Sequence, residues 1–397
     1  MLIGLVGKPS SGKSTFFKAS TLAEAEIASY PFTTIKPNHG IAFTRVECVE
    51  KEFNVKCNPR LGYCINGTRF VPVEMLDVAG LVPGAHEGKG MGNQFLDDLR
   101  QADAFIHIVD ASGSTNEKGE AISAGSYDPA LDIIFLEKEL DMWYYSILKK
   151  GWERLSRRIQ QEGLDVTKAL AKQLSGLNVT EEIVKEVVKK LKLNLERPDL
   201  WTEKELMALA NNLRGITKPM AIAANKIDIT GSEKNLARLR EQFPSIKIIP
   251  CSADSELALK EAASRGLISY LHGDASFNLL KTPAEKQKQA LDFIQKNVLD
   301  KFGSTGVQET IDYAVFELLK YIAIFPGGVS KLEDSEGRRL PDCFLLKQGS
   351  TALDFAFKLH TDFGKNFVRA IDVKTKKTVG KEHILKHRDV IEIVSRK

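Results

Sequence analysis

The sequence predicts an α/β protein. A doubly wound parallel sheet is interrupted by an inserted α-helical domain and followed by a small α+β domain. Apolar strand-like runs alternate with helical patterns up to residue 127 and again from residue 215. Between them, from Asp128 to Arg214, the apolar spacing is helical throughout. After Ile324 the pattern changes to short alternating strands, which indicates a separate domain.

Length and composition limit the class of protein. The chain has 397 residues, enough for two or three domains, and no apolar run approaches the ~20 residues of a membrane span. It begins Met-Leu-Ile-Gly-Leu and has five cysteines, an odd number, so we expect a cytoplasmic protein with neither signal peptide nor disulfide framework. Residues 324–397 carry 15 Lys or Arg against 10 Asp or Glu. This excess fits either a polyanion partner or an ordinary solvated surface.

The first apolar run leads into a phosphate-loop pattern. Residues Gly7 to Ser14 read Gly-Lys-Pro-Ser-Ser-Gly-Lys-Ser and fit G-x-x-x-x-G-K-[ST] between a strand and a helix. Such a loop presents backbone N–H groups to an anion at a helix N-terminus. We expect Lys13 to reach the β- and γ-phosphates and Ser14 to bind Mg²⁺. The predicted nucleotide contacts here are Gly7, Lys8, Pro9, Ser10, Ser11, Gly12, Lys13, Ser14 and Thr15.

Two later segments predict the groups around the γ-phosphate. Thr33 and Thr34 are candidates for a Mg²⁺ ligand that senses the γ-phosphate. An apolar strand then ends at Asp77-Val78-Ala79-Gly80, a D-x-x-G pattern. Here Asp77 would act on Mg²⁺ through water, and the N–H of Gly80 would donate to the γ-phosphate.

The residue after this pattern bears on the rate of hydrolysis. Many GTPases have there the glutamine that orients the attacking water, whereas this chain has Leu81, which cannot. Either another group orients the water, or hydrolysis is slow until a partner supplies one. His86, in the glycine-rich loop that follows, is either a water-positioning group or an ordinary polar loop residue.

A second group of motifs predicts the contacts to the base. An apolar strand ends in Asn225-Lys226-Ile227-Asp228, an N-K-x-D pattern. The carboxylate of Asp228 can accept hydrogen bonds from guanine N1–H and N2–H₂, whereas adenine would leave it unpaired. Lys226 would stack on the ring. After the next strand, the backbone N–H groups of Ser252-Ala253 would donate to guanine O6.

Three cysteines lie in a predicted β-ribbon with the arms Arg45–Phe53 and Arg69–Leu76. Cys48, Cys57 and Cys64 are separated by nine and seven residues. A metal site would need closer pairs and a fourth ligand. We therefore expect buried or idle thiols rather than a metal site.

The remaining segments have ordinary structural interpretations. We expect His107, in the strand Ala104–Asp110, to be a satisfied core residue, and residues 113–127 to be a linker. The first helix of the insert would run to Ile159, and later helices are expected at 179–193, 202–213, 283–302 and 308–322. One helical face could hold RNA or could simply be solvated. That face comprises Lys149, Lys150, Arg154, Arg157 and Arg158, with Trp152 and Tyr144 nearby.

These motifs in this order resemble the translation-factor-class P-loop GTPases. Residues 30–38 (YPFTTIKPN) and 77–90 (DVAGLVPGAHEGKG) are similar to the Obg family. The helical insert and residues 349–356 (GSTALDFA) resemble its YchF, or Obg-like ATPase, branch. The last stretch resembles a TGS domain, which threonyl-tRNA synthetases and (p)ppGpp synthetases also contain. The resemblance covers essentially the whole chain and implies a β-grasp-like TGS fold with a ribosome- or RNA-associated role.

The resemblance also implies a division of the chain and several residue roles. Residues 1–127 and 215–275 would form the GTPase domain, 128–214 the helical insert, 276–323 a helical connector, and 324–397 the TGS domain. Thr34 would be the switch threonine, and a hydrophobic residue such as Leu81 in place of glutamine is a family habit. YchF proteins that prefer ATP have lost the N-K-x-D aspartate, so Asp228 favours GTP. Relatives hold K⁺ with an asparagine where this chain has Ser10, which leaves K⁺ stimulation open.

Three hypotheses for the function follow. The first is a slow GTPase switch that acts on the ribosome or another RNA–protein complex, uses Mg²⁺, and has neither DNA nor membrane as a partner. Its catalytic groups would be Lys13, Thr34, Gly80 and His86, and its metal ligands Ser14, Thr34 and Asp77. The second is an RNA-binding module whose nucleotide only locks its shape. The third is an ATPase of the YchF type. The oligomeric state stays open.

Overall fold

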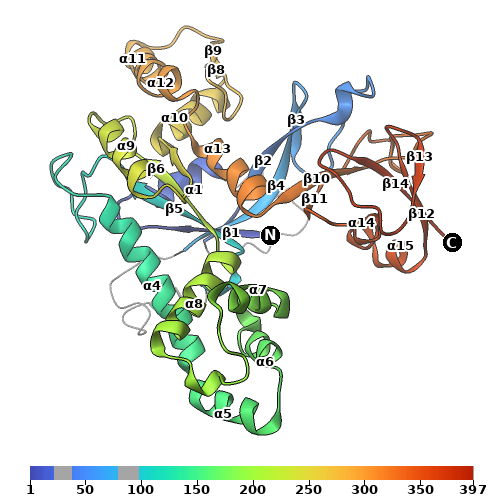
Figure 1. Cartoon of the computed structure of the whole chain (residues 1–397). Helices are drawn as coiled ribbons and strands as arrows, with labels where there is room; N and C mark the ends of the chain where they lie inside the picture. Colours follow the sequence, from blue (N-terminus) through green and yellow to red (C-terminus); the bar gives the residue numbers. More distant parts are fainter. Residues whose placement is uncertain (22–37, 79–97, 397) are drawn as a thin grey trace. The chain divides into compact units, whose positions relative to one another are not determined.

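The computed structural model describes residues 1–21, 38–78 and 98–396 (Figure 1). These residues form two compact units. The first contains residues 1–19, 38–39, 75–78 and 98–310, and the second contains residues 20–21, 40–74 and 311–396. Within the described ranges, no helix has the length and apolar character needed to cross a membrane.

The first unit is built on a parallel sheet with the order β1–β5–β6–β7. Its strands are β1 (Leu2–Val6), β5 (Ala104–Asp110), β6 (Met220–Asn225) and β7 (Ile248–Pro250). The register pairs Ile3 with Ala104 and Phe105 with Met220. Every residue of β5 and β6 is buried, as expected for strands covered on both faces.

Helices follow these strands and cover the sheet. They are α1 (Lys13–Ser20), α4 (Ala130–Lys149), α9 (Ser232–Gln242) and α10 (Ala253–Ser264). Apolar side chains of α4 and α9, such as Ile133 and Leu239, pack with Val109 and Ile222 of the strands in one core cluster. The α/β prediction is confirmed, and the loops that carry the predicted motifs leave from the carboxyl ends of the strands, where such sheets bind ligands.

The helical insert contains more helices than the sequence pattern showed. After α4 come α5 (Trp152–Glu162), α6 (Val166–Gln173), α7 (Glu181–Leu191) and α8 (Glu203–Thr217), with 3₁₀ turns at Ser175–Leu177 and Pro198–Leu200. The prediction of one helix running to Ile159 is wrong, because Gly151 adopts a left-handed φ of 79° and ends the first helix. At the start of α8, Thr202 and Glu205 form a capping box.

The aromatic residues expected near the basic face are inside the insert. Trp152 stacks on Trp201 with ring centroids 5.2 Å apart, and both rings are buried. Tyr144 is buried as well, and its hydroxyl lies 2.8 Å from that of Thr217. Neither ring faces solvent, so of the two interpretations of this face the solvated basic surface fits the structure, and RNA binding through these two rings does not.

The first unit ends with a helical connection. A short hairpin, β8 (Ile268–Ser269) and β9 (Asn278–Leu279), precedes α11 (Glu285–Ile294), a π turn (Gln295–Leu299), α12 (Asp300–Phe302) and α13 (Val307–Asp312). The predicted helix 283–302 is confirmed apart from its first two residues. The predicted helix 308–322 extends too far, because the helical stretch ends in a π turn at Tyr313–Leu318. Lys320, with a φ of 55°, then turns the chain into a strand.

The second unit contains a β-ribbon and a five-stranded sheet. The ribbon comprises β2 (His39–Glu47), β3 (Tyr63–Ile65) and β4 (Thr68–Asp77), and β3 pairs antiparallel with β4. The first arm lies earlier in the chain than the predicted Arg45–Phe53, because β2 ends at Glu47 and a 3₁₀ turn at Val49–Lys51 follows it. The last three residues of β4 belong to the first unit, where the N–H of Val78 donates to the carbonyl of Leu5.

The five-stranded sheet has the order β11–β10–β14–β12–β13. Its elements are β10 (Tyr321–Pro326), β11 (Phe344–Lys347), β12 (Phe367–Asp372), β13 (Lys377–Val379) and β14 (Val390–Ser395), with helices α14 (Ala352–Leu359) and α15 (Thr361–Lys365). Phe355 of α14 packs with Ile324 and Ile391 of the sheet. The predicted small α+β domain is therefore present.

Two glycines of the insert give a test of the break between α4 and α5. We expect Gly151→Ala to lower the free energy of unfolding by about 1 kcal/mol, because a Cβ is strained at the left-handed φ of 79° although nothing lies within 4 Å of it. Gly215→Ala, equally open but inside α8, should instead raise it by up to ~1 kcal/mol. Urea unfolding of both variants measures this. Equal effects would show that the backbone at Gly151 is not constrained.

Candidate nucleotide-binding site

The phosphate loop connects β1 to α1 as the sequence predicted. The helix begins with a hydrogen bond of 2.9 Å from Phe16 N to Gly12 O. Gly12 has a φ of +93°, and a Cβ built there would lie 2.1 Å from Nδ2 of Asn225. Only glycine fits this position, because both the conformation and the close approach exclude a side chain.

Three of the residues predicted to hold phosphate and metal meet beside the loop. Nζ of Lys13 forms an ion pair with Oδ1 of Asp77, and Oγ of Ser14 lies 3.4 Å from Oδ2 of the same carboxylate. A hydroxyl and a carboxylate are hard oxygen donors of the kind that Mg²⁺ prefers. The arrangement therefore fits the predicted metal ligands Ser14 and Asp77. Thr34, Gly80, Leu81 and His86 lie outside the described residues.

The side chain of Asn225 joins three of the predicted segments. Its Nδ2 donates to Ser11 O at 2.9 Å, and its Oδ1 accepts from Ala253 N at 3.0 Å. Asp228 follows in the next turn and is half-buried. Within the described part of the chain, its carboxylate has no hydrogen-bond or ion-pair partner, so both oxygens can accept from a ligand.

The backbone N–H groups of the Ser252-Ala253 turn donate within the protein. The N–H of Ser252 donates to Thr305 O at 2.9 Å, and the N–H of Ala253 donates to Asn225. The side chain of Ser252 caps α10 by accepting from Ser255 N. The predicted donors to guanine O6 are therefore both engaged within the protein, and the turn instead holds Asn225 in place.

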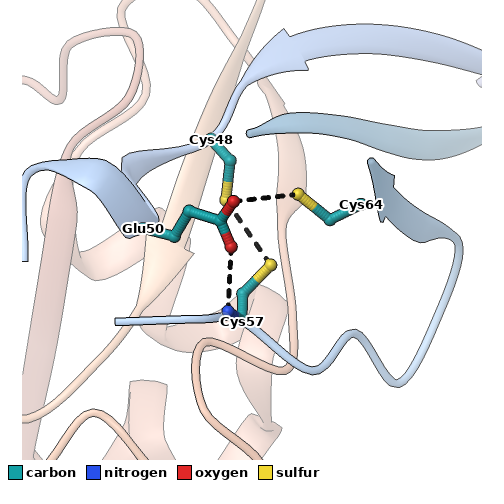
Figure 2. Close-up of side chains that lie close together, drawn as sticks. All are labelled: Cys48, Glu50, Cys57 and Cys64. Carbon is teal, nitrogen blue, oxygen red and sulfur yellow. Dashed lines mark hydrogen bonds between the residues drawn. The ribbon is translucent and has the colours of Figure 1, made fainter. Parts of the chain in front are cut away.

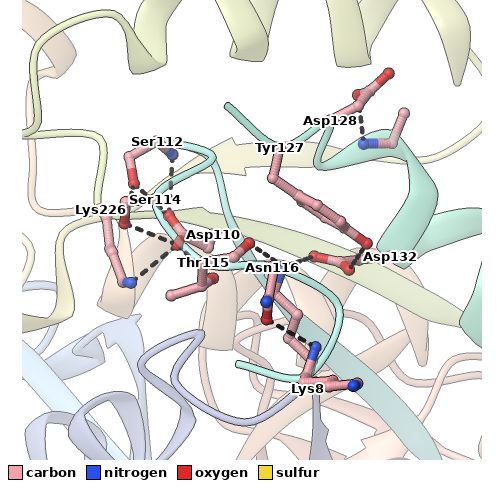
Figure 3. Close-up of polar contacts among 12 residues, drawn as sticks. Lys8, Asp110, Ser112, Ser114, Thr115, Asn116, Tyr127, Asp128, Asp132 and Lys226 are labelled. Carbon is pink, nitrogen blue, oxygen red and sulfur yellow. Dashed lines mark hydrogen bonds and ion pairs between the residues drawn. The ribbon is translucent and has the colours of Figure 1, made fainter. Parts of the chain in front are cut away.

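Lys226 leads to a buried carboxylate that sequence reasoning missed. Its Nζ lies 2.9 Å from Oδ2 of Asp110, the fully buried last residue of β5 (Figure 3). The hydroxyls of Ser112, Ser114 and Thr115 also donate to this carboxylate. Burial by itself would raise the pKa of Asp110, but these hydrogen bonds, led by that of Ser112, and the ammonium of Lys226 lower it below its ordinary value.

The predicted linker at 113–127 is therefore an ordered loop against the phosphate loop. Gly119, with a φ of +81°, lies so close to Pro9 that a Cβ would approach the Pro9 side chain within 2.7 Å. The carbonyl of Thr115 accepts from Lys8 Nζ at 2.9 Å. A run of hydroxyl residues directly after a buried strand was the available signal, since such side chains often bond to a nearby aspartate.

Lys8 connects the phosphate loop to the first helix of the insert. This lysine is buried, forms an ion pair of 2.9 Å with the buried Asp132 of α4, and lies 3.8 Å from the ring centroid of Tyr127 (Figure 3). Burial raises the pKa of Asp132 even though Lys8 opposes the shift. Lys8 was predicted as a loop residue that contacts nucleotide, but its ammonium is used inside the protein.

His107 lies in the core of the sheet but is not satisfied as predicted. Burial in β5 lowers the pKa of His107 to about 3, which keeps the imidazole neutral. Its Nδ1 has no hydrogen-bond partner among the described residues. The side chain lies near Gly7 and Lys8, where a positive charge would be unfavourable.

Family models match the chain on both sides of the helical insert. The 50S ribosome-binding GTPase family matches residues 2–137, the Obg-like GTPase YGR210-like, G4 motif-containing domain matches 223–328, and the TGS domain matches 333–395. An uncharacterized GTP-binding protein of Methanocaldococcus jannaschii is 52% identical over 99% of both chains. The chain belongs to the Obg-like family of P-loop GTPases. Its predicted place in the YchF-related branch and its predicted fold class are confirmed.

Other relatives of this Obg-like protein are similar to it over nearly the whole chain. The ribosome-binding ATPase YchF of Bacillus subtilis is 29% identical, over 92% of this chain and 87% of that protein. The crystal structure of a GTP-binding protein from Pyrococcus horikoshii superposes with a TM-score of 0.79 at 41% identity and covers 100% of both chains. The YchF GTPase of Schizosaccharomyces pombe, at 21% identity and a TM-score of 0.59 over 99% and 97% of the two chains, shares the fold.

Asp110 gives a pH-dependent test of the site's internal support. Because folding lowers the pKa of Asp110, its stabilising contribution is present above the ordinary aspartate pKa of about 4 and is lost as pH falls towards the folded value. We expect Asp110→Asn to lower the free energy of unfolding by about 2 kcal/mol at pH 7, since a buried group loses its charged partners. The deficit should shrink at about pH 3, below the ordinary aspartate pKa, as urea unfolding at pH 7 and at that pH can measure.

The matched control for Asp110 is an exposed ion pair in the insert. Arg158 and Glu162 form a pair at 3.1 Å whose side chains are 60% and 51% exposed. Glu162→Gln should therefore change the free energy of unfolding by less than about 0.5 kcal/mol. A deficit in Asp110→Asn that is equal at pH 7 and at about pH 3 would contradict the role assigned to its charge.

Proposed function

We propose that this protein binds GTP, hydrolyses it slowly to GDP and phosphate, and acts as a switch in the cytoplasm on the ribosome or another RNA–protein complex. We choose guanine as the base because the carboxylate of Asp228 is half-buried and has no partner among the described residues. It follows Asn225, whose amide connects the phosphate loop to the Ser252-Ala253 turn. A carboxylate here matches the paired donors of guanine and not the edge of adenine.

The phosphate end supports hydrolysis by positioning and charge neutralisation. Lys13 pairs with Asp77 and would exchange this carboxylate for the β- and γ-phosphates of a bound nucleotide. Ser14 and Asp77 would then hold Mg²⁺, which neutralises developing charge on the phosphates. Thr34 and Gly80 complete the proposed γ-phosphate contacts. Slow turnover is proposed because Leu81 cannot orient water, and His86 is the candidate that could replace it.

The proposed RNA or ribosome partner has support from the second unit and from relatives. Lys376 and Lys377 are exposed at the turn between β12 and β13, within the positively charged C-terminal region. Relatives that share the whole architecture are named ribosome-binding ATPases. That same name supports the alternative of ATP as the substrate, so the identity of the base must be tested directly.

The first experiment compares nucleotide affinities. Titration of nucleotide-free protein with GTP, GDP and ATP in the presence of Mg²⁺ should show a preference for guanine of about 100-fold or more, ~3 kcal/mol. Asp228→Asn should remove most of this preference, whereas Asp292→Asn, an exposed control on α11, should retain it. Equal or tighter binding of ATP by the unaltered protein would overturn the GTP proposal and favour the ATPase alternative.

The second experiment separates a switch from a binding module. Lys13→Ala should abolish GTP hydrolysis, because the positive charge nearest the γ-phosphate is lost. Turnover by the unaltered protein should be slow alone and should rise at least tenfold when ribosomes are added. A rate near zero in both conditions would favour an RNA-binding module, and unchanged turnover in Lys13→Ala would contradict the proposed mechanism.

A further inference from the structure

Three thiols and one carboxylate that the nucleotide site does not use lie together in the second unit. Cys48 follows β2, Glu50 lies in the 3₁₀ turn, Cys57 lies in the segment after it, and Cys64 belongs to β3. The three sulfurs and a carboxylate oxygen are all within 4.8 Å of one another (Figure 2). Sequence separations of nine and seven residues predicted idle thiols, but the fold brings these side chains to one point.

The spacing of these atoms matches a tetrahedral metal site. Sγ of Cys48 and Sγ of Cys57 are 3.8 Å apart, and Sγ of Cys64 is 3.8 Å from Oε1 of Glu50. A tetrahedron with metal–sulfur bonds of about 2.3 Å has sulfur–sulfur edges of about 3.8 Å and sulfur–oxygen edges of about 3.5 Å. An ion could therefore sit among the four atoms after side-chain movements of up to about 1 Å, since no pair is farther apart than 4.8 Å.

Backbone hydrogen bonds hold the ligands in this arrangement. The N–H of Cys57 donates to Oε2 of Glu50 at 2.9 Å, which leaves Oε1 directed towards the sulfurs (Figure 2). The N–H of Cys48 donates to Gly67 O at 2.8 Å, and Val55 N donates to Glu50 O at 3.0 Å. Metal ligands are commonly oriented by such outer hydrogen bonds.

The charges around the cluster also favour a cation. Cys48 is fully buried and Cys57 is buried as well, so a charge that forms on either sulfur is largely shielded from water. A thiolate and the Glu50 carboxylate in the same place are costly unless a positive charge compensates them. Arg69 is fully buried nearby, but its guanidinium donates to the carbonyls of Leu340 and Pro341. Arg69 therefore reduces the negative charge without occupying the cluster.

We propose that Cys48, Glu50, Cys57 and Cys64 bind one Zn²⁺ ion. Three thiolates and one carboxylate are soft-to-intermediate ligands that suit Zn²⁺ and not Mg²⁺ or Ca²⁺, and iron–sulfur clusters ordinarily need four cysteines. A disulfide could use only two of the three thiols and would leave the third beside Glu50. Binding releases the thiol protons to solvent.

The proposed ion would have a structural role, and it could reach the site from solvent through a surface pocket. Residues 48–62 join β2 to β3 with one 3₁₀ turn as their regular structure, and a metal that connects their two ends would stabilise this long segment. A surface pocket of about 530 Å³ has Glu50, Cys57 and Cys64 in its lining, which gives an ion access. The proposal does not depend on nucleotide binding.

The test measures metal on the full-length protein. After purification without chelator and extensive dialysis, inductively coupled plasma mass spectrometry should find about one zinc per chain. Replacement by Co²⁺ should give the absorption of a tetrahedral thiolate site. Removal of the metal should lower the melting temperature, and added Zn²⁺ should restore it. Absence of bound zinc together with failure of the metal-free protein to take up Co²⁺ would overturn the proposal.

Variants identify the ligands. Cys57→Ser and Cys64→Ser should lose most of the zinc, and Glu50→Gln should weaken its binding about tenfold or more. Cys251→Ser, a buried cysteine of the first unit, is the matched control and should retain full zinc content. Should the cysteine variants fail to fold, Co²⁺ titration of Glu50→Gln and of the unaltered protein still decides the question.

Cys343 allows the fourth ligand to be checked. It packs against the same apolar cluster as Cys48 and Cys57, but its sulfur is not among the four neighbouring ligand atoms. Cys343→Ser should therefore retain zinc. Loss of zinc in Cys343→Ser with full retention in Glu50→Gln would overturn the assignment of Glu50. Oxidation of two thiols to a disulfide in metal-free, freshly purified protein would favour a redox pair and contradict the zinc site.

Discussion

The side-chain amide of Asn225 holds the segments of the candidate nucleotide site together. Asn225 donates to the phosphate loop through Ser11 O and accepts from Ala253 at the N-terminus of α10, so the segments after β1, β6 and β7 are held by a single side chain. The amide can make both bonds only if the backbone at Gly12 approaches closely, which excludes a Cβ there. The glycine of the phosphate loop therefore serves the contact with the base-side motif as well as the phosphate.

The buried carboxylate of Asp110 stabilises the same edge of the sheet. Asp110 ends β5 and binds the ammonium of Lys226, while its remaining lone pairs accept from the hydroxyls of the following loop. Because these donors come from Lys226, directly after β6, and from the 112–115 segment, the carboxylate fixes where the loop lies. Lys226 keeps only its aliphatic stem available for a base.

Several elements could be predicted from the sequence because their signals are local. The strand Ala104–Asp110 is a buried run that ends in a polar residue, and its predicted bounds are those of the structure. The boundaries that failed have ambiguous signals: Gly151 interrupts a helix without disturbing the apolar spacing, and the apolar residues around Tyr321 fit a helix as well as a strand. The phosphate-loop and N-K-x-D segments were found because each motif is contiguous in the chain.

The parts of the sites that were not predicted depend on which strands are neighbours. Asp110 meets Lys226 because β5 lies beside β6, and no pattern within either segment shows that pairing. The cysteine cluster is similar, since its members approach only when the segment after β2 folds back onto β3. Sequence separation therefore does not predict which side chains meet when a long irregular segment folds back and brings distant residues together.

The ion pair between Lys8 and Asp132 connects the first helix of the insert to the phosphate loop. Asp132 lies in the first turn of α4, a helix of 20 residues that is about 30 Å long. With its first turn anchored to the loop, the helix is a lever arm: a tilt of about 10° at Lys8 displaces its far end by about 5 Å. A change in the phosphate loop that tilted this helix would therefore be enlarged at the distal end of the insert.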